Sequence, residues 1–423
     1  MKKKRIVYIL AGVLAAVLLA VSGILFYYFS VMKQTLNEVT TPEEAKTLYC
    51  VYVLNEDPAQ NLSDTAGYRY GASATAWEQE EFEQVLRSLN EQLGLSPDLL
   101  EYEDLFTLVD GLKKQECRAI VLNEAYLISI AEAQGYEWVE DGLRKITSIE
   151  VMQTGQAEKE PSAPEQMPET FLMYISGIDT FGGISTRSRS DVNIIAAVNT
   201  STKQILLLST PRDYYVDFAA TKGQKDKLTH AGIYGVEASM DALERLYDVD
   251  IDYYLRINFT GFVEIIDALG GIEVYSEYDF TVENIKNYHK GYNHLTGLEA
   301  LAFARERYSF PSGDYQRAKN QMEVIRAVVD KCTSPAILQN FPAVMGAIAG
   351  SFETNMPQDQ IMALITAQLT QNSRWETNMY TAIGSNAYRP TYSMPGRDLF
   401  VILPDPGSVQ EAKQKLVEIT SSR

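Results

Sequence analysis

The sequence predicts an α/β protein in which helices cover both faces of a central sheet, and three observations lead to this fold class. Apolar residues make up 46% of the 423-residue chain and charged residues 22%, which is typical of a globular protein. After residue 170, β-branched runs of strand length alternate with segments of helical periodicity. A stretch rich in Pro, Glu and Gln at 155–169 separates this region from an earlier one, so we expect more than one domain.

The first patterned segment is a predicted transmembrane helix over residues 6–32. These 27 residues carry no charged side chain, and at about 1.5 Å per residue they can cross ~30 Å of hydrocarbon. Four cations fill residues 2–5, so the positive-inside rule keeps residues 1–5 in the cytoplasm and places the later chain outside, as a single-pass protein of the cytoplasmic membrane. The alternative is a cleaved signal peptide, which normally has a shorter apolar region and a small-x-small cleavage site.

The rest of the chain is strongly acidic. Without the four N-terminal cations, 33 lysines and arginines face 56 aspartates and glutamates. Such a charge repels phosphate backbones at long range, so we expect no nucleic acid among the partners, and a bound anion would need a local cluster of arginines. Cys50, Cys117 and Cys332 have no metal-binding spacing, and a Cys50–Cys117 disulfide and buried free thiols both stay open.

Residues 35–150 are expected to form a small α+β domain. Its predicted elements are two helices and two short apolar runs, at 77–93, 124–133, 105–109 and 119–122. Tyrosines and carboxylates are scattered through this unit without a pattern that indicates chemistry. We therefore interpret it as an accessory or spacer domain, which the linker at 155–169 joins to a catalytic domain over 170–423.

Strands and helices are predicted to alternate through this catalytic domain. The expected strands cover 171–178, 192–199, 204–209, 253–257 and 272–275, with two more near 377–383 and 399–403. The expected helices cover 237–247, 259–269, 296–303 and 315–332, with others near 337–350, 357–371 and 409–419. The tail therefore continues the same fold.

Three short stretches concentrate functional groups at the predicted ends of strands and helices. They contain Asp179, Arg187, Arg189 and Asp191; then Arg212 after Pro211; then Arg305, Arg307, Asp314, Arg317 and Gln321. Six of the chain's 18 arginines fall in the windows 187–212 and 305–317. Because a guanidinium stays charged and binds phosphate oxygens bidentately, this clustering predicts a pyrophosphate site. In α/β proteins, ligands bind at such strand ends.

The carboxylates among these arginines suggest a metal ion. Asp179 and Asp191 are the expected ligands of Mg²⁺ or another hard divalent cation, which binds carboxylate and phosphate oxygens together. Asp314, Arg317 and Gln321 are spaced to share one face of a helix. The alternative is a set of surface ion pairs, each weak by itself. Four such groupings at strand ends and loop mouths favour a binding site.

At these residues the sequence resembles the LytR-CpsA-Psr family of cell-wall glycopolymer transferases. Seven motifs follow in the family's order: SGID (176–179), RSD (189–191), STPRD (209–213), KLTHAGIYG (227–235), IDALGGIEV (266–274), LTGLEALAFARER (295–307) and D-x-x-R-x-x-x-Q (314–321). The resemblance is strong over 171–331 and weaker in the tail. It implies a mixed central sheet between helical layers, and an anchor followed by an accessory domain is similar to the capsule-type members.

The resemblance also implies roles for the site residues. Asp179 and Asp191 correspond to the family's metal-proximal carboxylates, and its pyrophosphate-binding arginines correspond to Arg189, Arg212, Arg305 and Arg307. Beside them lie Asp314 and Arg317, with Gln321 as a further substrate contact. We expect a polyprenyl-pyrophosphate-linked anionic glycopolymer, such as capsule polysaccharide or teichoic acid, to be transferred onto peptidoglycan at the surface of the lipid bilayer. The identity of the glycopolymer and the oligomeric state stay open.

Two other functions stay open at this point. A polyprenyl-pyrophosphate hydrolase would use the same site with water as the acceptor. A non-catalytic module for binding or assembling the polyprenyl carrier would need the arginines for binding alone. Transcriptional regulation is disfavoured, because the acidic body is expected outside the cell. Asp191 and Asp314 are both candidates for the general base, and Asp314 is preferred because a carboxylate on Mg²⁺ is a poor base.

Overall fold

The computed structural model of the chain describes most of its length, namely residues 30, 34–40, 45–73, 79–152, 167–178, 180, 183–334, 344, 346–347, 350–371 and 373–421. None of the helices in these ranges is long and apolar enough to cross a membrane. The transmembrane helix expected over 6–32 lies outside the described residues, apart from Ser30. Most of the expected linker at 155–169 also lies outside them.

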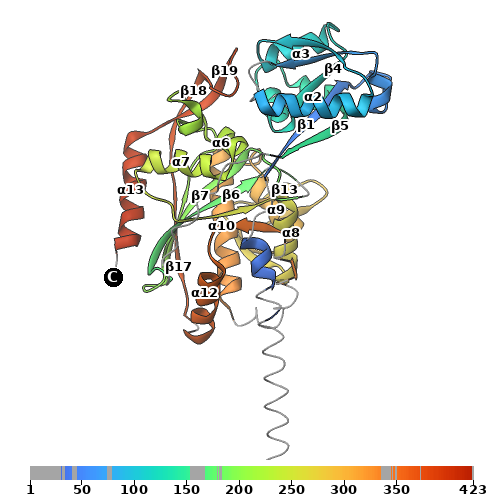
Figure 1. Cartoon of the computed structure of the whole chain (residues 1–423). Coiled ribbons are helices and arrows are strands. Elements are labelled where there is room, and N and C mark those ends of the chain that lie inside the picture. The colour runs from blue at the N-terminus through green and yellow to red at the C-terminus, as the bar shows by residue number, and fades with distance from the viewer. Residues whose placement is uncertain are drawn as a thin grey trace, which may run out of the picture.

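The N-terminal unit is a five-stranded sheet with a helix on each face (Figure 1). The strand order is β3-β2-β4-β1-β5, with β1 at Lys46–Leu54, β2 at Arg69–Ser73, β3 at Asp98–Tyr102, β4 at Ala119–Asn123 and β5 at Leu143–Met152. Side chains of β1 alternate between two cores: Tyr49 and Val51 pack with α2 (Gln79–Leu93), and Cys50 packs with α3 (Leu105–Lys113). Both faces of this strand are therefore buried.

The short apolar run at 105–109 is the first part of α3. Asp104 caps this helix by accepting hydrogen bonds from the backbone N–H groups of Phe106 and Thr107, at 2.8 Å each. The helix expected over 124–133 is present as a 3₁₀ turn followed by α4 (Leu127–Ala131), and α5 (Trp138–Gly142) comes next. Cys50 and Cys117 are buried free thiols, so the disulfide alternative is not realised.

The C-terminal unit is built on a six-stranded mixed sheet, which confirms the expected sheet type. Its strand order is β16-β11-β6-β7-β8-β17, where β6 (Thr170–Ile178), β7 (Ser190–Asn199) and β8 (Gln204–Ser209) form an antiparallel meander. On the outer sides, β11 (Tyr253–Ile257) runs parallel to β6, β17 (Glu376–Thr381) runs parallel to β8, and β16 (Phe352–Thr354) is an antiparallel edge strand. Since β17 joins this sheet, the tail belongs to the same fold.

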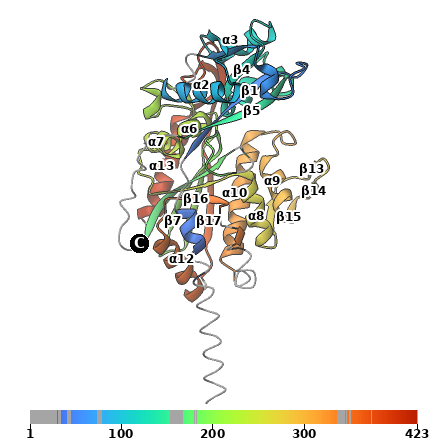
Figure 2. The ribbon, with the colours of Figure 1, turned by 45° about the vertical axis from the view of Figure 1, so that its right-hand side comes forward.

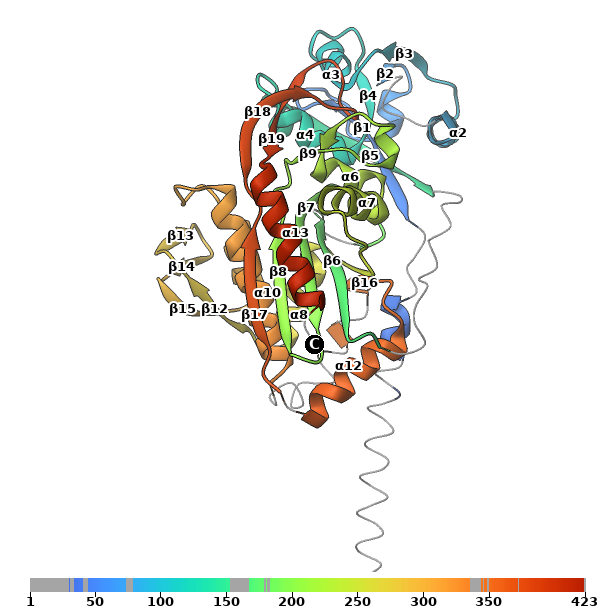
Figure 3. The same ribbon diagram turned by 90° about the vertical axis from the view of Figure 1, so that its left-hand side faces the viewer.

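Helices cover both faces of this sheet, as the sequence predicts. One face carries α6 (Leu228–Tyr234), α7 (Val236–Tyr247) and α13 (Pro406–Ser421), and Figure 3 shows α13 lying along the strands. The other face carries α10 (Asp314–Cys332) and α12 (Gln358–Gln371). Alternation along β7 sends Ile195 to the first face and Ile194 to the second, so both cores depend on this central strand.

A smaller layer lies beside α10 and has its own aromatic core (Figure 2). It contains two helices and two antiparallel pairs of strands, namely α8 (Phe259–Ala268), α9 (Gly297–Arg305), β12 (Ile272–Ser276) with β15 (Gly291–Leu295), and β13 (Phe280–Val282) with β14 (Lys286–Tyr288). The remaining short strands are β9 (Tyr215–Val216) with β10 (Asp226–Lys227), and β18 (Gly384–Pro390) with β19 (Asp398–Pro404). The helix expected near 337–350 lies almost wholly outside the described residues.

The two units share a buried interface. Ile233, Met394 and Leu399 of the C-terminal unit belong to the same apolar cluster as α3 and α4. His230 on α6 links the units, because its Nε2 lies 3.2 Å from the hydroxyl of Ser129 on α4. The other ring nitrogen, Nδ1, lies 2.7 Å from a carboxylate oxygen of Asp226. This interface holds α4 against the end of the mixed sheet where β7 begins.

Candidate anion-binding site

Most of the predicted site residues meet at one end of the mixed sheet. Because β7 runs antiparallel to β8, with Ile194 opposite Ser209, the start of β7 and the end of β8 lie at the same edge. Asp191 stands near the start of β7, and Arg212 follows β8 after a two-residue turn. Asp314 opens α10 at this edge and lines the same cavity as Asp191 and Arg212.

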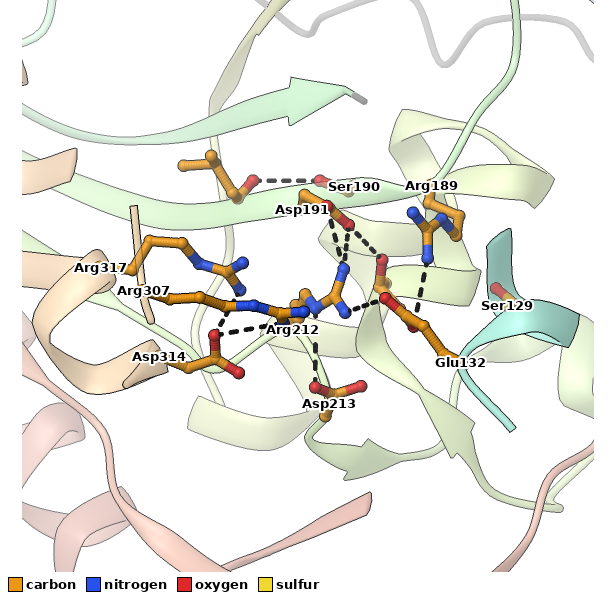
Figure 4. A network of polar contacts seen from close by, with 12 residues as sticks. Ser129, Glu132, Arg189, Ser190, Asp191, Arg212, Asp213, Arg307, Asp314 and Arg317 are labelled. Atoms are coloured by element: carbon orange, nitrogen blue, oxygen red, sulfur yellow. Dashed lines mark hydrogen bonds and ion pairs between the residues drawn. The ribbon is translucent and has the colours of Figure 1, made fainter. Parts of the chain in front are cut away.

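Arg212 is the centre of an ion-pair network (Figure 4). Its Nη1 donates to both carboxylate oxygens of Asp191, at 3.0 Å each, and its Nη2 donates to Oε1 of Glu132 at 2.5 Å. Its Nε lies 3.6 Å from a carboxylate oxygen of Asp213, too far for a hydrogen bond. Burial would lower the pKa of Arg212, but the three carboxylates outweigh it and hold this pKa above its usual value. Arg212 is therefore a buried, permanently charged group.

A second ion-pair group lies beside the first. Oδ1 of Asp314 lies 3.1 Å from Nη2 of Arg317 and 3.6 Å from Nη1 of Arg307. A small cavity of about 30 Å³ joins the two groups, and its lining includes Asp191, Arg212, Asp213, Asp314, Arg317 and Gln321. The expectation that Asp314, Arg317 and Gln321 share a helix face is confirmed, since all three line this cavity.

The surroundings of Arg317 disfavour its charged form. Burial lowers the pKa of Arg317, and the neighbouring cations Arg212 and Arg307 lower it further, although Asp314 opposes them. Burial would raise the pKa of Asp191, but the arginines, led by Arg212, outweigh it and hold this pKa well below its usual range. A phosphate near Arg317 would relieve the crowding of cations that destabilises its charged form.

Arg189 and Arg305 occupy different surroundings. Arg189 is 2% exposed, and its Nη1 lies 3.4 Å from Oε2 of Glu132, so it belongs to the network around Arg212. The guanidinium of Arg305, at the end of α9, lies over the ring of Phe259 with 4.4 Å to its centroid. The structure thus joins Arg189, through Glu132, to Arg212, whereas it places Arg305 on an aromatic ring.

Of the two expected metal ligands, the structure describes only Asp191. Asp179 lies outside the described residues, so the structure does not place it. Within the described part of the chain, no three His, Cys, Asp or Glu side chains form a group that could hold a metal ion. Asp191 accepts hydrogen bonds from Arg212 and also, at 3.2 Å, from the hydroxyl of Thr229. Because the arginines lower its pKa, Asp191 offers an ionised carboxylate at neutral pH at the edge of the cavity.

The structure adds site residues that the sequence reasoning missed. Lys227 lies 3.0 Å from Asp213, and both residues, with Thr229, fall inside motifs that carry the family resemblance. Glu132 carried no such signal, because it lies 57 residues before Arg189 and 80 before Arg212. The sequence shows no pattern of functional groups in residues 35–150, whereas the structure brings Glu132 of this unit to Arg189 and Arg212.

A mixed sheet between helical layers, with arginines and carboxylates around a cavity at one strand end, defines an α/β protein with a candidate anion-binding site. The chain belongs to the LytR_cpsA_psr family, whose model matches residues 143–398. This range includes every site residue predicted from the sequence and excludes Glu132.

The alignments with curated relatives cover only part of each relative's sequence. The chain is 36% identical over 194 residues to the polyisoprenyl-teichoic acid–peptidoglycan teichoic acid transferase TagU of Bacillus cereus, over 46% of this chain and 62% of that protein. TagU of Enterococcus faecalis is 36% identical over 202 residues, which is 46% of this chain and 64% of that protein. The chain therefore spans less than two thirds of the length of these relatives.

Two solved structures have a fold similar to that of 60% of this chain. TagV of B. subtilis is 25% identical with a TM-score of 0.50, over 60% of this chain and 98% of that one. Protein gbs0355 of Streptococcus agalactiae is 22% identical with a TM-score of 0.51, over 60% of this chain and 89% of that one. These similarities agree with the mixed α/β fold described above.

Proposed function

We propose that this chain transfers an anionic glycopolymer, such as teichoic acid or capsule polysaccharide, from a polyprenyl-pyrophosphate carrier to peptidoglycan. The observation that carries the proposal is the cluster of buried and partly buried arginines and carboxylates around one cavity, above all Arg212 and Arg317. Family membership and the teichoic acid transferase activity named for the TagU relatives support it. The anchor proposed over 6–32 would hold the site outside the cytoplasmic membrane, near the bilayer that carries the substrate.

The proposed reaction is a displacement at phosphorus. A hydroxyl oxygen of a peptidoglycan sugar attacks the glycan-side phosphorus, a new P–O bond forms, the bond to the bridging oxygen breaks, and polyprenyl phosphate leaves. Negative charge grows on the bridging and leaving oxygens, where the N–H groups of Arg212 and Arg317 can stabilise it. The hydroxyl proton goes to a carboxylate. Asp314, whose side chain is 35% exposed, suits this role better than Asp191, whose two oxygens already accept from Arg212.

We also propose that Mg²⁺ or another hard divalent cation binds at Asp191, with Asp179 as the second ligand. Two observations support this donor set: Asp191 stays ionised at the edge of the cavity, and Ile178, the residue before Asp179, pairs with Ser190, the residue before Asp191. When bound, the ion would neutralise part of the phosphate charge. The arginines contribute the same kind of stabilisation from their own positions.

A reconstituted transfer assay tests the proposal. Purified full-length protein is mixed with a synthetic polyprenyl-pyrophosphate-linked teichoic acid precursor and with peptidoglycan. We expect polyprenyl phosphate to be released only when peptidoglycan is present, together with covalent attachment of the glycan. Arg317→Ala should abolish this release, whereas Arg245→Ala, which changes an exposed arginine paired with Asp241, should not.

The same assay separates the competing functions. Equal release of polyprenyl phosphate with water as the only acceptor would identify a hydrolase instead. Tight binding of the precursor without any release, in the presence of acceptor and Mg²⁺, would identify a carrier-binding or assembly module. Either result would contradict the proposed transferase activity.

A further inference from the structure

The N-terminal unit places one acidic side chain among the arginines of the site. Glu132 caps the C-terminal end of α4, and its two carboxylate oxygens lie 2.5 Å from Nη2 of Arg212 and 3.4 Å from Nη1 of Arg189. Figure 4 shows this carboxylate between the two guanidinium groups. Since the family model begins at residue 143, Glu132 comes from outside the family domain.

A carboxylate in this position uses the donors that a phosphate would need. Guanidinium N–H groups bind carboxylate and phosphate oxygens with the same bidentate geometry. The charges of Arg212 and Arg189 keep Glu132 ionised, since they outweigh the effect of burial and lower its pKa. While Glu132 is paired, Nη2 of Arg212 and Nη1 of Arg189 face an anion that belongs to the protein itself.

Glu132 stands on a helix that is packed at the unit interface, but its own side chain is partly exposed to solvent. The adjoining helix is anchored at the unit interface, where Ile130 is fully buried and Ser129 contacts His230. The side chain of Glu132 is nevertheless 29% exposed, whereas those of Arg189 and Arg212 are 3% and 7% exposed. The two arginines are therefore enclosed by the protein, and the carboxylate is the partner with more access to solvent.

We propose that Glu132 is a built-in competitor for the phosphate-binding donors of Arg189 and Arg212, so that a pyrophosphate group binds by displacing this carboxylate. This inference rests on the proposed function, because it requires the arginine cluster to bind pyrophosphate. The N-terminal unit would then lower the affinity of the site for pyrophosphate, because its carboxylate occupies the same N–H donors. A ligand binds to these N–H groups only if its own interaction with them is stronger than that of the Glu132 carboxylate.

Calorimetry with inorganic pyrophosphate tests the competition in the full-length protein. Glu132→Gln keeps the size of the side chain and removes its charge, and Glu132→Ala removes the whole competitor. Coupling between two sites typically changes affinity by about 5–150-fold, so we expect both variants to bind pyrophosphate at least fivefold more tightly than the unmodified protein. Glu124→Gln is the matched control, because Glu124 lies in the same unit but pairs with Lys145 at 2.7 Å, and its affinity should not change.

The outcomes distinguish this inference from the proposed function. If the unmodified protein binds pyrophosphate and both Glu132 variants, shown to be folded by circular dichroism, bind it equally or less tightly, Glu132 positions the arginines and the competition is refuted. If neither the unmodified protein nor the variants bind pyrophosphate with or without Mg²⁺, the anion site itself fails, and the proposed function fails with it. Tighter binding in the Glu124→Gln control would also refute a specific role for Glu132, because any lost negative charge would then suffice.

Discussion

Replacing Arg212 with Ala should destabilise the fold as well as abolish transfer, and its contacts set the size of the effect. Arg212 lies close to Asp191, Glu132 and Asp213. Removing one partner of a buried ion pair costs about 3–5 kcal/mol, mainly because the other charge is left unpaired. Asp213 keeps its ion pair with Lys227, and Glu132 keeps its ion pair with Arg189. The carboxylate that loses most of its pairing is therefore Asp191. We therefore expect a loss near the lower end of that range, about 3 kcal/mol in the free energy of unfolding.

The size of this loss should depend on pH. The pKa of Asp191 in the folded protein lies below its usual value of about 3.9. The paired carboxylate therefore stabilises the native protein fully above pH ~3.9, and this stabilisation is lost as the pH falls toward the folded-state pKa. In Arg212→Ala the carboxylate of Asp191 stays partly buried without its main cation, so its folded-state pKa rises. The variant should therefore be most penalised at pH 7, and the difference from the unmodified protein should shrink as the pH is lowered toward about 4.

Urea unfolding at pH 7, 5.5 and 4 measures this difference, with Arg245→Ala as the control. Arg245 is half exposed and pairs with Asp241 on the surface of α7, so its removal should change the free energy of unfolding by less than about 1 kcal/mol. An Arg212→Ala protein within 1 kcal/mol of the unmodified protein at pH 7 would show that the network is not a buried ion-pair cluster. A loss of about 3 kcal/mol that stays constant with pH would refute the assignment of that loss to the carboxylates.

Three further predictions concern the metal, the unit interface and the topology. Calorimetry should show that a pyrophosphate lipid analogue binds the unmodified protein more tightly with Mg²⁺, and that the double change Asp179→Asn with Asp191→Asn removes this dependence. An affinity of the unmodified protein that does not change with Mg²⁺ or with chelator would contradict the metal proposal. His230→Ala should lower the free energy of unfolding by about 2–3 kcal/mol, because it removes a fully buried ring that bridges Ser129 and Asp226, and a change under about 0.5 kcal/mol would contradict this role. External protease should cleave the 155–169 linker in spheroplasts, and protection of the linker there would refute the extracytoplasmic topology.

The central strands and long helices could be predicted closely from the sequence. The expected strands at 192–199 and 204–209 are found as β7 and β8, and the expected helix at 315–332 is α10 with one more residue at its start. These segments are buried on one or both faces, so their apolar residues follow the period of the element. The arginines of the site were also evident, since a short motif fixes their positions relative to the strand ends.

An element that its pairing defines, and not its own composition, was not evident. The strand β18 (Gly384–Pro390) contains Gly, Asn, Arg and Pro, which are typical of loops, and most of its residues are exposed. It forms a strand because it pairs along its whole length with β19, from Gly384 opposite Pro404 to Pro390 opposite Asp398. The partner supplies the hydrogen bonds that define the strand, and local composition contains no information about that partner.

Glu132 could not be found for a related reason, and its position changes how the site must work. Before any substrate binds, the cations of the site already face the carboxylates Asp191, Asp213, Asp314 and Glu132. A pyrophosphate therefore does not enter a site of unpaired positive charge; it exchanges with a carboxylate that is already there. Asp213 is 6% exposed and its pairing with Lys227 is internal, so it is poorly placed to move. Glu132 belongs to a separate unit and its side chain is 29% exposed, so it is better placed to move than Asp213. An acidic chain can in this way keep a buried arginine cluster folded and soluble, at the cost of affinity for small anions, and reserve the site for a ligand with enough phosphate charge to replace the carboxylate.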